Sequence, residues 1–258
     1  MILVDILILG CGFTGERVAL RFVQRGATVA AVSRNPESKQ SLAEAGVRVT
    51  TLEALPPVAT GTRVLYSIPT LIPDVLAALT GKAARMVYLS TTGVYKNTRD
   101  VNENTPTGEH TRLEAERAIA AGPWPALILR PAAIYGPGRG IQVSMSRGEF
   151  RLVGDGSNFV SRIHVDDLAA HCEAALLSNL TGAYPVADEE PCSSHEIAAF
   201  CAKLLGVPMP PSVSADEVHD TRRADRRVDG SAIRKLLGIN LKYPSYRVGI
   251  PASLEHIR

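Results

Sequence analysis

Short apolar runs alternate with polar or amphipathic segments along the first half of the chain. Runs that are almost continuously apolar are typical of parallel strands covered by helices on both faces of a sheet. The pattern therefore predicts an α/β fold with a doubly wound parallel sheet. The predicted strands lie at Leu3–Leu9, Thr28–Val32, Val47–Leu52, Arg63–Ile68, Met86–Ser90 and Ala126–Leu129.

The pattern changes after residue 130, where glycine and proline crowd the segment Pro131–Gly140. Helical periodicity then returns at Val165–Leu177, His195–Leu205 and Ser231–Leu237. We expect residues 1–130 to form one domain to which 164–188 return, and residues 131–163 and 189–258 to form a smaller C-terminal lobe for a second ligand. Between Leu52 and Thr62 only a short link with Pro56 and Pro57 is present, so one crossover helix is expected to be shortened or missing.

A glycine-rich turn, Gly10-Cys11-Gly12-Phe13-Thr14-Gly15, directly follows the first apolar run and precedes an amphipathic helical pattern. In a Rossmann-type fold the first glycine of G-x-G-x-x-G permits the tight turn, the second lets the backbone approach a pyrophosphate, and the third lets helix and strand pack closely. We therefore expect Gly10, Gly12, Phe13, Thr14 and Gly15 to bind a dinucleotide. A purely structural glycine turn is the alternative.

The second apolar run ends in Ser33 and Arg34, at the point where such folds approach the adenosine ribose. A carboxylate there would favour NAD(H), whereas a guanidinium and a hydroxyl can pair with a 2′-phosphate. This favours NADP(H) over NAD(H). The alternative is a solvated arginine.

Composition excludes several classes of protein. The chain has 258 residues and a formal net charge of +2, which provides no broad basic field for nucleic acid. No apolar run is long enough to span a membrane, and no secretory signal is evident. The four cysteines lack metal-ligand spacing, so we expect buried thiols, no metal site and a cytoplasmic location. They are Cys11, Cys172, Cys192 and Cys201.

Several motifs in the right order resemble the extended short-chain dehydrogenase/reductase family, the NAD(P)-dependent epimerase/dehydratase group. They occupy Leu89–Tyr95, Asn102–Pro106, Leu129–Gly138, Ile163–Ala169 and Tyr243–Tyr246. The resemblance implies a Rossmann-type sheet with a small C-terminal substrate-binding lobe. It also implies that the cofactor is lined by further residues, Ser67, Ile68, Pro69 and Pro131.

The chain departs from this family at the catalytic tyrosine and lysine, because those positions fall on Gly108 and Arg112. The resemblance implies that Thr91 orients the substrate oxygen. Arg112 can hold the nicotinamide ribose, but a guanidinium stays charged and relays no proton. Tyr95 is the nearest candidate to replace the tyrosine, and Tyr135 and His110 are alternatives.

Two functions stay open at this point. One is an NADP(H)-dependent oxidoreductase or epimerase, acting on a small sugar-like or phosphorylated substrate. The other is a catalytically silent NADP(H)-binding redox sensor or scaffold. The basic run Arg222–Arg227 could bind an anionic substrate group, or it is a solvated turn balanced by nearby acids. We expect a monomer or a homodimer, with a helix that starts at a Thr111 capping box and with Asp166 and Asp167 capping the helix that follows them.

Overall fold

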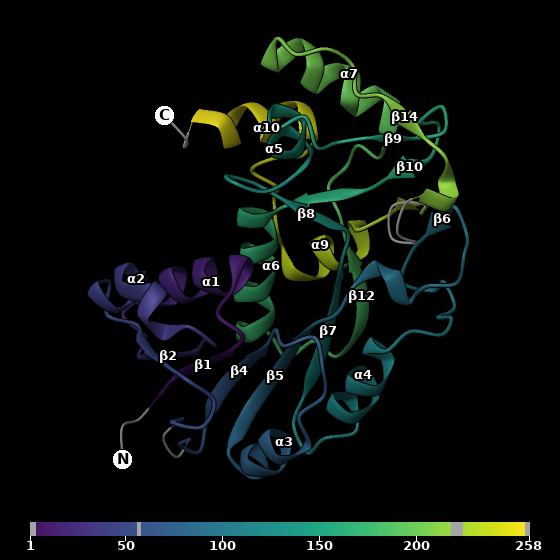
Figure 1. The fold of residues 1–258 in the computed structure, drawn as a ribbon. Helices are drawn as coiled ribbons and strands as arrows, with labels where there is room; N and C mark the ends of the chain where they lie inside the picture. The colour runs from purple at the N-terminus through teal and green to yellow at the C-terminus, as the bar shows by residue number, and fades with distance from the viewer. Residues whose placement is uncertain (1–3, 56–57, 218–223, 256–258) are drawn as a thin grey trace. The chain divides into compact units, whose positions relative to one another are not determined.

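The central element is a seven-stranded sheet in the order β12-β7-β5-β4-β1-β2-β3 (Figure 1). The computed structural model describes residues 4–55, 58–217 and 224–255. Neighbouring strands from β3 to β7 pair in parallel, which confirms the predicted α/β, Rossmann-like architecture. The strands are β1 (Ile6–Leu9), β2 (Val29–Val32), β3 (Arg48–Thr50), β4 (Thr62–Tyr66), β5 (Ala83–Leu89), β7 (Ala126–Pro131) and β12 (Gly182–Val186).

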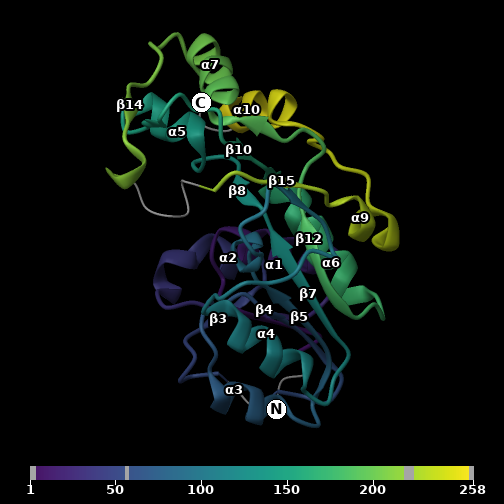
Figure 2. The same cartoon turned by 90° about the vertical axis from the view of Figure 1, so that its right-hand side faces the viewer.

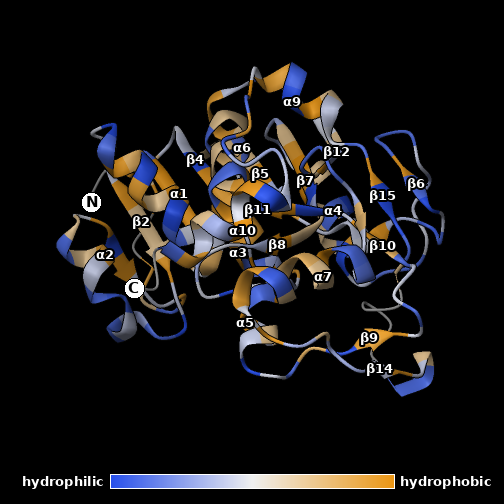
Figure 3. Ribbon diagram, turned by 90° about the horizontal axis from the view of Figure 1, so that it is seen from above, coloured by the Kyte–Doolittle hydropathy of each residue, from blue (hydrophilic) through white to orange (hydrophobic). Residues whose placement is uncertain are grey.

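Helices cover both faces of this sheet, as the apolar strands require (Figures 1 and 2). Residues of α3 (Pro73–Leu79) and α4 (Arg112–Ala120) join the apolar cluster that contains Leu7 and Leu9 of β1. On the other face lie α1 (Phe13–Gln24) and α6 (Val165–Leu177). An ion pair of 2.5 Å between Arg21 and Glu173 links these two helices. Figure 3 shows apolar residues on β2 and β7 and an alternation of apolar and polar residues along α1.

The link between β3 and β4 contains no helix among its described residues, while Pro56 and Pro57 lie outside them. A short 3-10 turn, η1 (Pro36–Lys39), and α2 (Gln40–Glu44) connect β2 to β3. A second 3-10 turn, η2 (Thr92–Val94), follows β5. The edge strand β12 was not among the predicted strands.

The start of α4 differs from the prediction. Thr111 occupies the N-cap position but has helical backbone angles and makes no capping hydrogen bond through its side chain, so the predicted capping box is wrong. The His110 ring replaces it, because its Nδ1 atom accepts the backbone N–H of Arg112 at 3.0 Å.

The chain divides into two compact units. The first comprises residues 1–94, 109–130 and 168–184, and the second comprises 95–108, 131–167 and 185–258. The second unit therefore also takes in residues 95–108.

The second unit is built from paired two-residue and three-residue strands around a small apolar core. Its core is formed by Tyr135, Met145, Leu152, Ile197, Tyr246 and Ile250, among others. Its strand pairs are β6 (Asp100–Val101) with β15 (Arg227–Val228), β8 (Ala133–Tyr135) with β11 (Arg162–His164), β9 (Leu152–Val153) with β14 (Ser212–Val213), and β10 (Phe159–Val160) with β13 (Cys192–Ser193). Its helices are α5 (Ile141–Ser146), α7 (Ser194–Leu205), η3 (Ala215–Glu217), α9 (Ser231–Leu237) and α10 (Tyr246–Glu255). Within the described ranges, no helix is long and apolar enough to cross a membrane.

Candidate functional site

The glycine turn after β1 is held against the neighbouring strands. Gly10 has a φ of +95°, a conformation that favours glycine. A Cβ there would lie 3.1 Å from the backbone of Ser67 and Ile68, at the end of β4. The backbone N–H groups of Gly10 and Cys11 both donate to the carbonyl of Val32, at the end of β2. The turn is thus fixed between β2 and β4.

The three motif glycines have different surroundings. A Cβ on Gly15 would lie 2.7 Å from the carbonyl oxygen of Gly10, so any side chain there would push α1 away from the turn. A Cβ on Gly12 would meet no atom within 4 Å, and Gly12 is exposed just before the first residue of α1. The space beside Gly12 is therefore open at a helix N-terminus, which fits a dinucleotide phosphate.

The first turn of α1 carries further candidate cofactor contacts. Thr14 is buried, and Phe13 is half-buried. The Arg17 guanidinium lies 4.4 Å from the Phe13 ring centroid and donates to the Phe13 carbonyl at 2.8 Å. Burial raises the pKa of the Cys11 thiol to about 12, so this thiol stays protonated and is no nucleophile.

Ser33 and Arg34 follow β2 directly. The Ser33 N–H donates to the Thr50 carbonyl at 2.9 Å, which fixes this backbone to the end of β3. The Arg34 side chain is exposed, and within the described ranges no ion pair to it is recorded. It is therefore available to an external anion, whereas the nearby cation Lys39 is paired with Glu16 of α1.

Beyond the end of β5, Thr91, His110 and Arg112 come together within the first unit. The Arg112 Nη1 atom donates to the Leu89 carbonyl at 3.0 Å, which ties the start of α4 to β5. A Cβ on Gly93 would lie 3.2 Å from His110 Nε2 and 3.4 Å from Thr91 Oγ1. The His110 ring and the Thr91 side chain therefore both pack closely against Gly93.

A buried ionic network lies directly behind this group. The Arg130 guanidinium forms two hydrogen bonds to the Glu116 carboxylate, at 2.6 and 3.1 Å, and the Ser90 hydroxyl donates to the same carboxylate. Both charged side chains are almost fully buried. The network fixes Ser90, and through it the backbone that carries Thr91. Pro131, the last residue of β7, is also buried.

A cavity of about 240 Å³ adjoins the N-terminus of α4. It is lined by Pro69, Thr70, Leu71, Pro73, Thr111, Arg112 and Glu114. Threonine hydroxyls, the Arg112 guanidinium and the Glu114 carboxylate are among the lining groups, so the cavity suits a polar group.

The other candidates for acid–base chemistry lie in the second unit. Tyr95 is only 2% exposed, and its backbone carbonyl accepts from Arg226. Tyr135 is also buried, and burial, with the negative charges of Asp188 and Asp167, raises the pKa of its hydroxyl. A Cβ on Gly108 would make ordinary contacts with Lys96.

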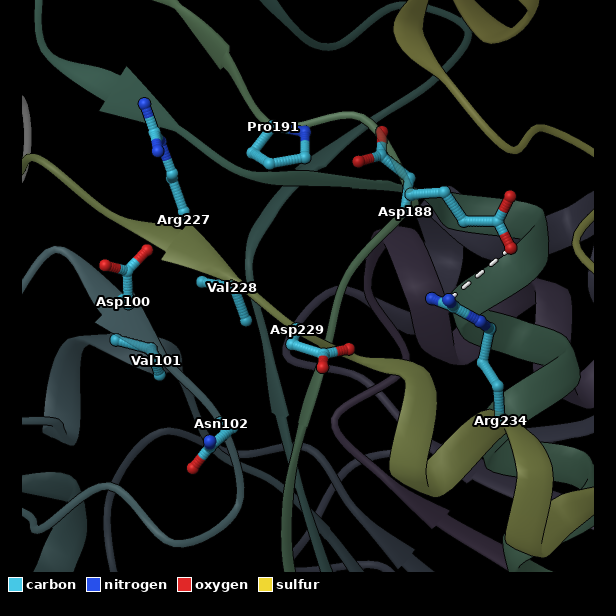
Figure 4. A pocket seen from close by; sticks show the side chains of 10 residues that line it. Asp100, Val101, Asn102, Asp188, Pro191, Arg227, Val228, Asp229 and Arg234 are labelled. Atoms are coloured by element: carbon cyan, nitrogen blue, oxygen red, sulfur yellow. Dashed lines mark ion pairs between the residues drawn. The ribbon is translucent and has the colours of Figure 1, made fainter.

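The second unit contains its own cavity, of about 430 Å³ (Figure 4). It is lined by Asp100, Val101, Asn102, Asp188, Glu189, Pro191, Arg227, Val228, Asp229 and Arg234. Figure 4 shows the ion pair between Arg234 and Glu189, at 3.4 Å. Burial raises the pKa of Asp188 to about 8, although the Arg162 charge and the Glu190 backbone N–H oppose the shift.

Several charged residues singled out in the sequence have structural contacts. Arg222 and Arg223 lie outside the described residues, while Asp225 pairs with Arg99 at 2.6 Å. Arg227 lies 3.9 Å from the Phe159 ring centroid. The Asp167 carboxylate accepts the backbone N–H groups of residues 242 and 243 and so anchors that segment. In the part of the chain that the structure describes, no cluster of side chains could hold a metal ion.

Comparison with known proteins supports a nicotinamide site in the first unit. Residues 5–93 match a family model described as "NADP oxidoreductase coenzyme F420-dependent". This match contains the glycine turn, Arg34 and the end of β5. A "3-diazoavenalumate denitrifying reductase" from Streptomyces is 30% identical over 152 residues, which cover 53% of this chain. The match spans 50% of that relative.

Solved structures match the whole fold. A functionally unknown conserved protein from Silicibacter pomeroyi is 31% identical, with a TM-score of 0.85 and coverage of 97% of this chain and 98% of that one. The UDP-glucuronic acid 4-epimerase from Bacillus cereus, in complex with NAD, is 18% identical, with a TM-score of 0.77 and coverage of 98% of both chains. At that identity the second match shows the fold alone.

Proposed function

Because this chain belongs to the same family as the functionally unknown Silicibacter pomeroyi protein, we propose its function from the geometry of its own site. We propose an NADP(H)-dependent oxidoreductase of the extended short-chain dehydrogenase/reductase type, acting on a small-molecule substrate. The observation that carries the proposal is the glycine turn, with open space beside Gly12 at the start of α1. The similarity to a named reductase supports the same class of activity.

Residues that belong to the first unit, with the exception of Pro131, would hold the cofactor in a defined order. The turn from Gly10 to Gly15 would bind the pyrophosphate through backbone N–H groups. Ser33 and Arg34 would bind the 2′-phosphate, and Ser67–Pro69 would line the middle of the cofactor. Arg112 would hold the nicotinamide ribose, and Pro131 would line that end. When bound, the nicotinamide supplies or accepts a hydride.

The substrate we propose is small and carries a carbonyl or hydroxyl group, with sugar-like or phosphorylated compounds as the preferred class. The second unit would bind it, in the cytoplasm, in a monomer or a homodimer without nucleic acid or membrane partners. Thr91 would orient the reacting oxygen. Tyr95 stays a predicted catalytic residue. The substitution Tyr95→Phe would test whether its hydroxyl is needed for turnover.

Cofactor choice can be tested by calorimetric titration with NADP⁺ and NAD⁺ at equal salt. We expect tighter binding of NADP⁺. Arg34→Ala should weaken NADP⁺ binding by about tenfold or more and leave NAD⁺ binding unchanged, because a charge-assisted hydrogen bond contributes about 1.5 kcal/mol or more. Arg63→Ala is the matched control. Arg63 is also exposed, but it lies near the amino end of β4, whereas Arg34 follows the carboxyl end of β2.

Equal losses for both cofactors in Arg34→Ala would contradict the NADP(H) preference. Failure of the wild type to bind either cofactor would contradict the whole proposal. Turnover is then measured as NADPH oxidation with a panel of aldehydes, ketoses, sugar phosphates and 3-diazoavenalumate. Binding without turnover on this panel would favour a silent NADP(H)-binding sensor or scaffold over an enzyme.

A further inference from the structure

We propose that the cavity of about 430 Å³ in the second unit binds a small organic cation, a compound that carries a protonated amino group. The Asp188 carboxylate would accept a hydrogen bond from this ammonium group. All the residues that line the cavity belong to the second unit. The proposal therefore stands apart from the oxidoreductase activity and can be tested without a nicotinamide cofactor.

The first observation is an unfilled hydrogen-bonding capacity at Asp188. This residue lines the cavity and is only 3% exposed. Neither oxygen atom of its carboxyl group has a hydrogen-bond partner in the part of the chain that the structure describes. The backbone N–H of Glu190 lies near the carboxyl group without forming a hydrogen bond to it. Because buried polar groups are nearly always hydrogen-bonded, Asp188 lacks a donor that a ligand can supply.

The second observation is the excess of acidic groups around the cavity. Figure 4 shows Asp100 on β6, Asp188 in the segment after β12, and Asp229 after β15. A fourth acid, Glu189, pairs with Arg234 at 3.4 Å. The three aspartates thus come from three separate segments of the chain and surround one space.

The two cations of the lining have contacts of their own. Besides its ion pair with Glu189, Arg234 donates to the Ala187 carbonyl at 2.8 Å. The Arg227 guanidinium lies 3.9 Å from the ring centroid of Phe159, which does not line the cavity. The four carboxyl groups therefore outnumber the two guanidinium groups, and the cavity favours a positively charged ligand.

The lining suits an organic cation better than a metal ion. In the described ranges, no group of histidine, cysteine, aspartate and glutamate side chains could hold a metal ion. An ammonium group has three N–H donors and can bind carboxylates that lie on different sides of it. Val101, Pro191 and Val228 provide apolar surface for a short carbon skeleton, and the volume lies in the range of small-molecule sites.

Binding can be measured by ¹H–¹⁵N NMR titration of the full chain with butylamine and 1,4-diaminobutane. Butanol and 1,4-butanediol are the neutral analogues, with the same carbon skeletons and no ammonium charge. We expect saturable shifts in the residues that line the cavity, with each amine binding about tenfold or more tightly than its alcohol. Equal binding of amines and alcohols, or no shift with either amine at millimolar concentration, would overturn the proposal.

Asp188→Asn tests the contact itself. It should weaken the binding of both amines about tenfold or more, because a hydrogen bond to a charged acceptor is replaced by one to a neutral amide. Asp155→Asn is the matched control, since Asp155 is an exposed acid of the same unit that does not line the cavity. Asp100→Asn, at an exposed lining position, should give a smaller loss and tests the site if Asp188→Asn does not fold. Unchanged amine binding in a folded Asp188→Asn protein would overturn the contact.

The protonation of Asp188 provides a further readout. Burial keeps its carboxyl group protonated up to about pH 8, so below that pH an ammonium group must displace a proton. We expect butylamine to bind roughly tenfold more tightly at pH 9 than at pH 7, as the ionised fraction of Asp188 increases. Besides the lining residues, the groups that act on Asp188 are Arg162, Glu190, Tyr135 and Cys192. Since the pKa values of Tyr135 and Cys192 are raised by burial, neither titrates in this range, and affinity that does not change with pH would contradict a contact with Asp188.

Discussion

Gly93 packs closely against the His110 ring and the Thr91 side chain, which leaves little room there for a Cβ. We expect Gly93→Ala to destabilise the protein by about 1 kcal/mol, because the new methyl would lie 3.2 Å from His110 Nε2 and displace the ring that caps α4. Gly93 does not have a positive φ, so the substitution should not strain the backbone. A thermal melt of the variant measures this effect.

A matched control is Gly108→Ala, where the added Cβ would make only ordinary contacts with Lys96. This variant should keep the thermal midpoint of the wild type. An unchanged thermal midpoint in Gly93→Ala would show that the His110 ring can move aside without loosening the start of α4.

Single residues also show where sequence reasoning stops. Thr91 and Arg112 were predicted as site residues from motifs, but the close packing of His110 on Gly93 was not. The two residues are far apart in the chain, and the loop between them does not have a periodic pattern. The capping role of His110 also escaped prediction, because Thr111-Arg112-Leu113-Glu114 has the residue types of a capping box.

At the scale of the first strand–turn–helix element, the three motif glycines should respond differently to alanine. Gly15→Ala should destabilise the fold by a few kcal/mol, because its Cβ would lie 2.7 Å from a backbone oxygen that cannot move without its strand. Gly12→Ala should keep the stability of the wild type and lose NADP⁺ affinity, because its methyl occupies open space that the phosphates would approach.

Urea unfolding and calorimetric titration of the two variants provide the measurement. Stable Gly12→Ala protein with unchanged NADP⁺ affinity would contradict a phosphate site at this turn. An unaffected Gly15→Ala variant would contradict the close packing of α1 on the turn.

Elements with strong periodicity were predicted well. The helices at Val165–Leu177 and Ser231–Leu237 have the expected bounds, and each predicted strand of the first half overlaps an observed one. The edge strand β12 was missed because Pro185 interrupts it and its first residues are not an apolar run. The strand β12 forms because its backbone hydrogen-bonds to β7 on one side. This pairing depends on the tertiary fold and cannot be inferred from the local sequence pattern.

At the scale of the whole molecule, the acid Asp188 should make global stability depend on pH. Sequence reasoning did not single it out, because its burial depends on how residues distant in the chain pack around it. Asp188 is 3% exposed, and burial raises the pKa of its carboxyl group from an ordinary 3.8 to about 8. Between about pH 4 and pH 8 the unfolded chain therefore loses a proton that the folded protein keeps.

The sign of the effect follows from proton linkage. Because the unfolded state binds fewer protons in this range, the free energy of unfolding contributed by Asp188 falls as pH rises from 4 to 8. Asp188→Asn removes the titration while preserving size. We expect the stability of the variant relative to the wild type to increase over this range by an amount on the order of a few kcal/mol.

Urea unfolding of both proteins at several pH values measures this difference, and Asp229 provides a control of opposite sign. Hydrogen bonds from Ser231 lower the pKa of Asp229, so the stability that its ionised form contributes is lost as pH falls. Asp229→Asn should therefore differ from the wild type most at high pH, where it lacks that contribution. A stability difference between Asp188→Asn and wild type that does not change with pH would show that Asp188 is ionised in the folded protein throughout, with Arg162 rather than burial setting its charge.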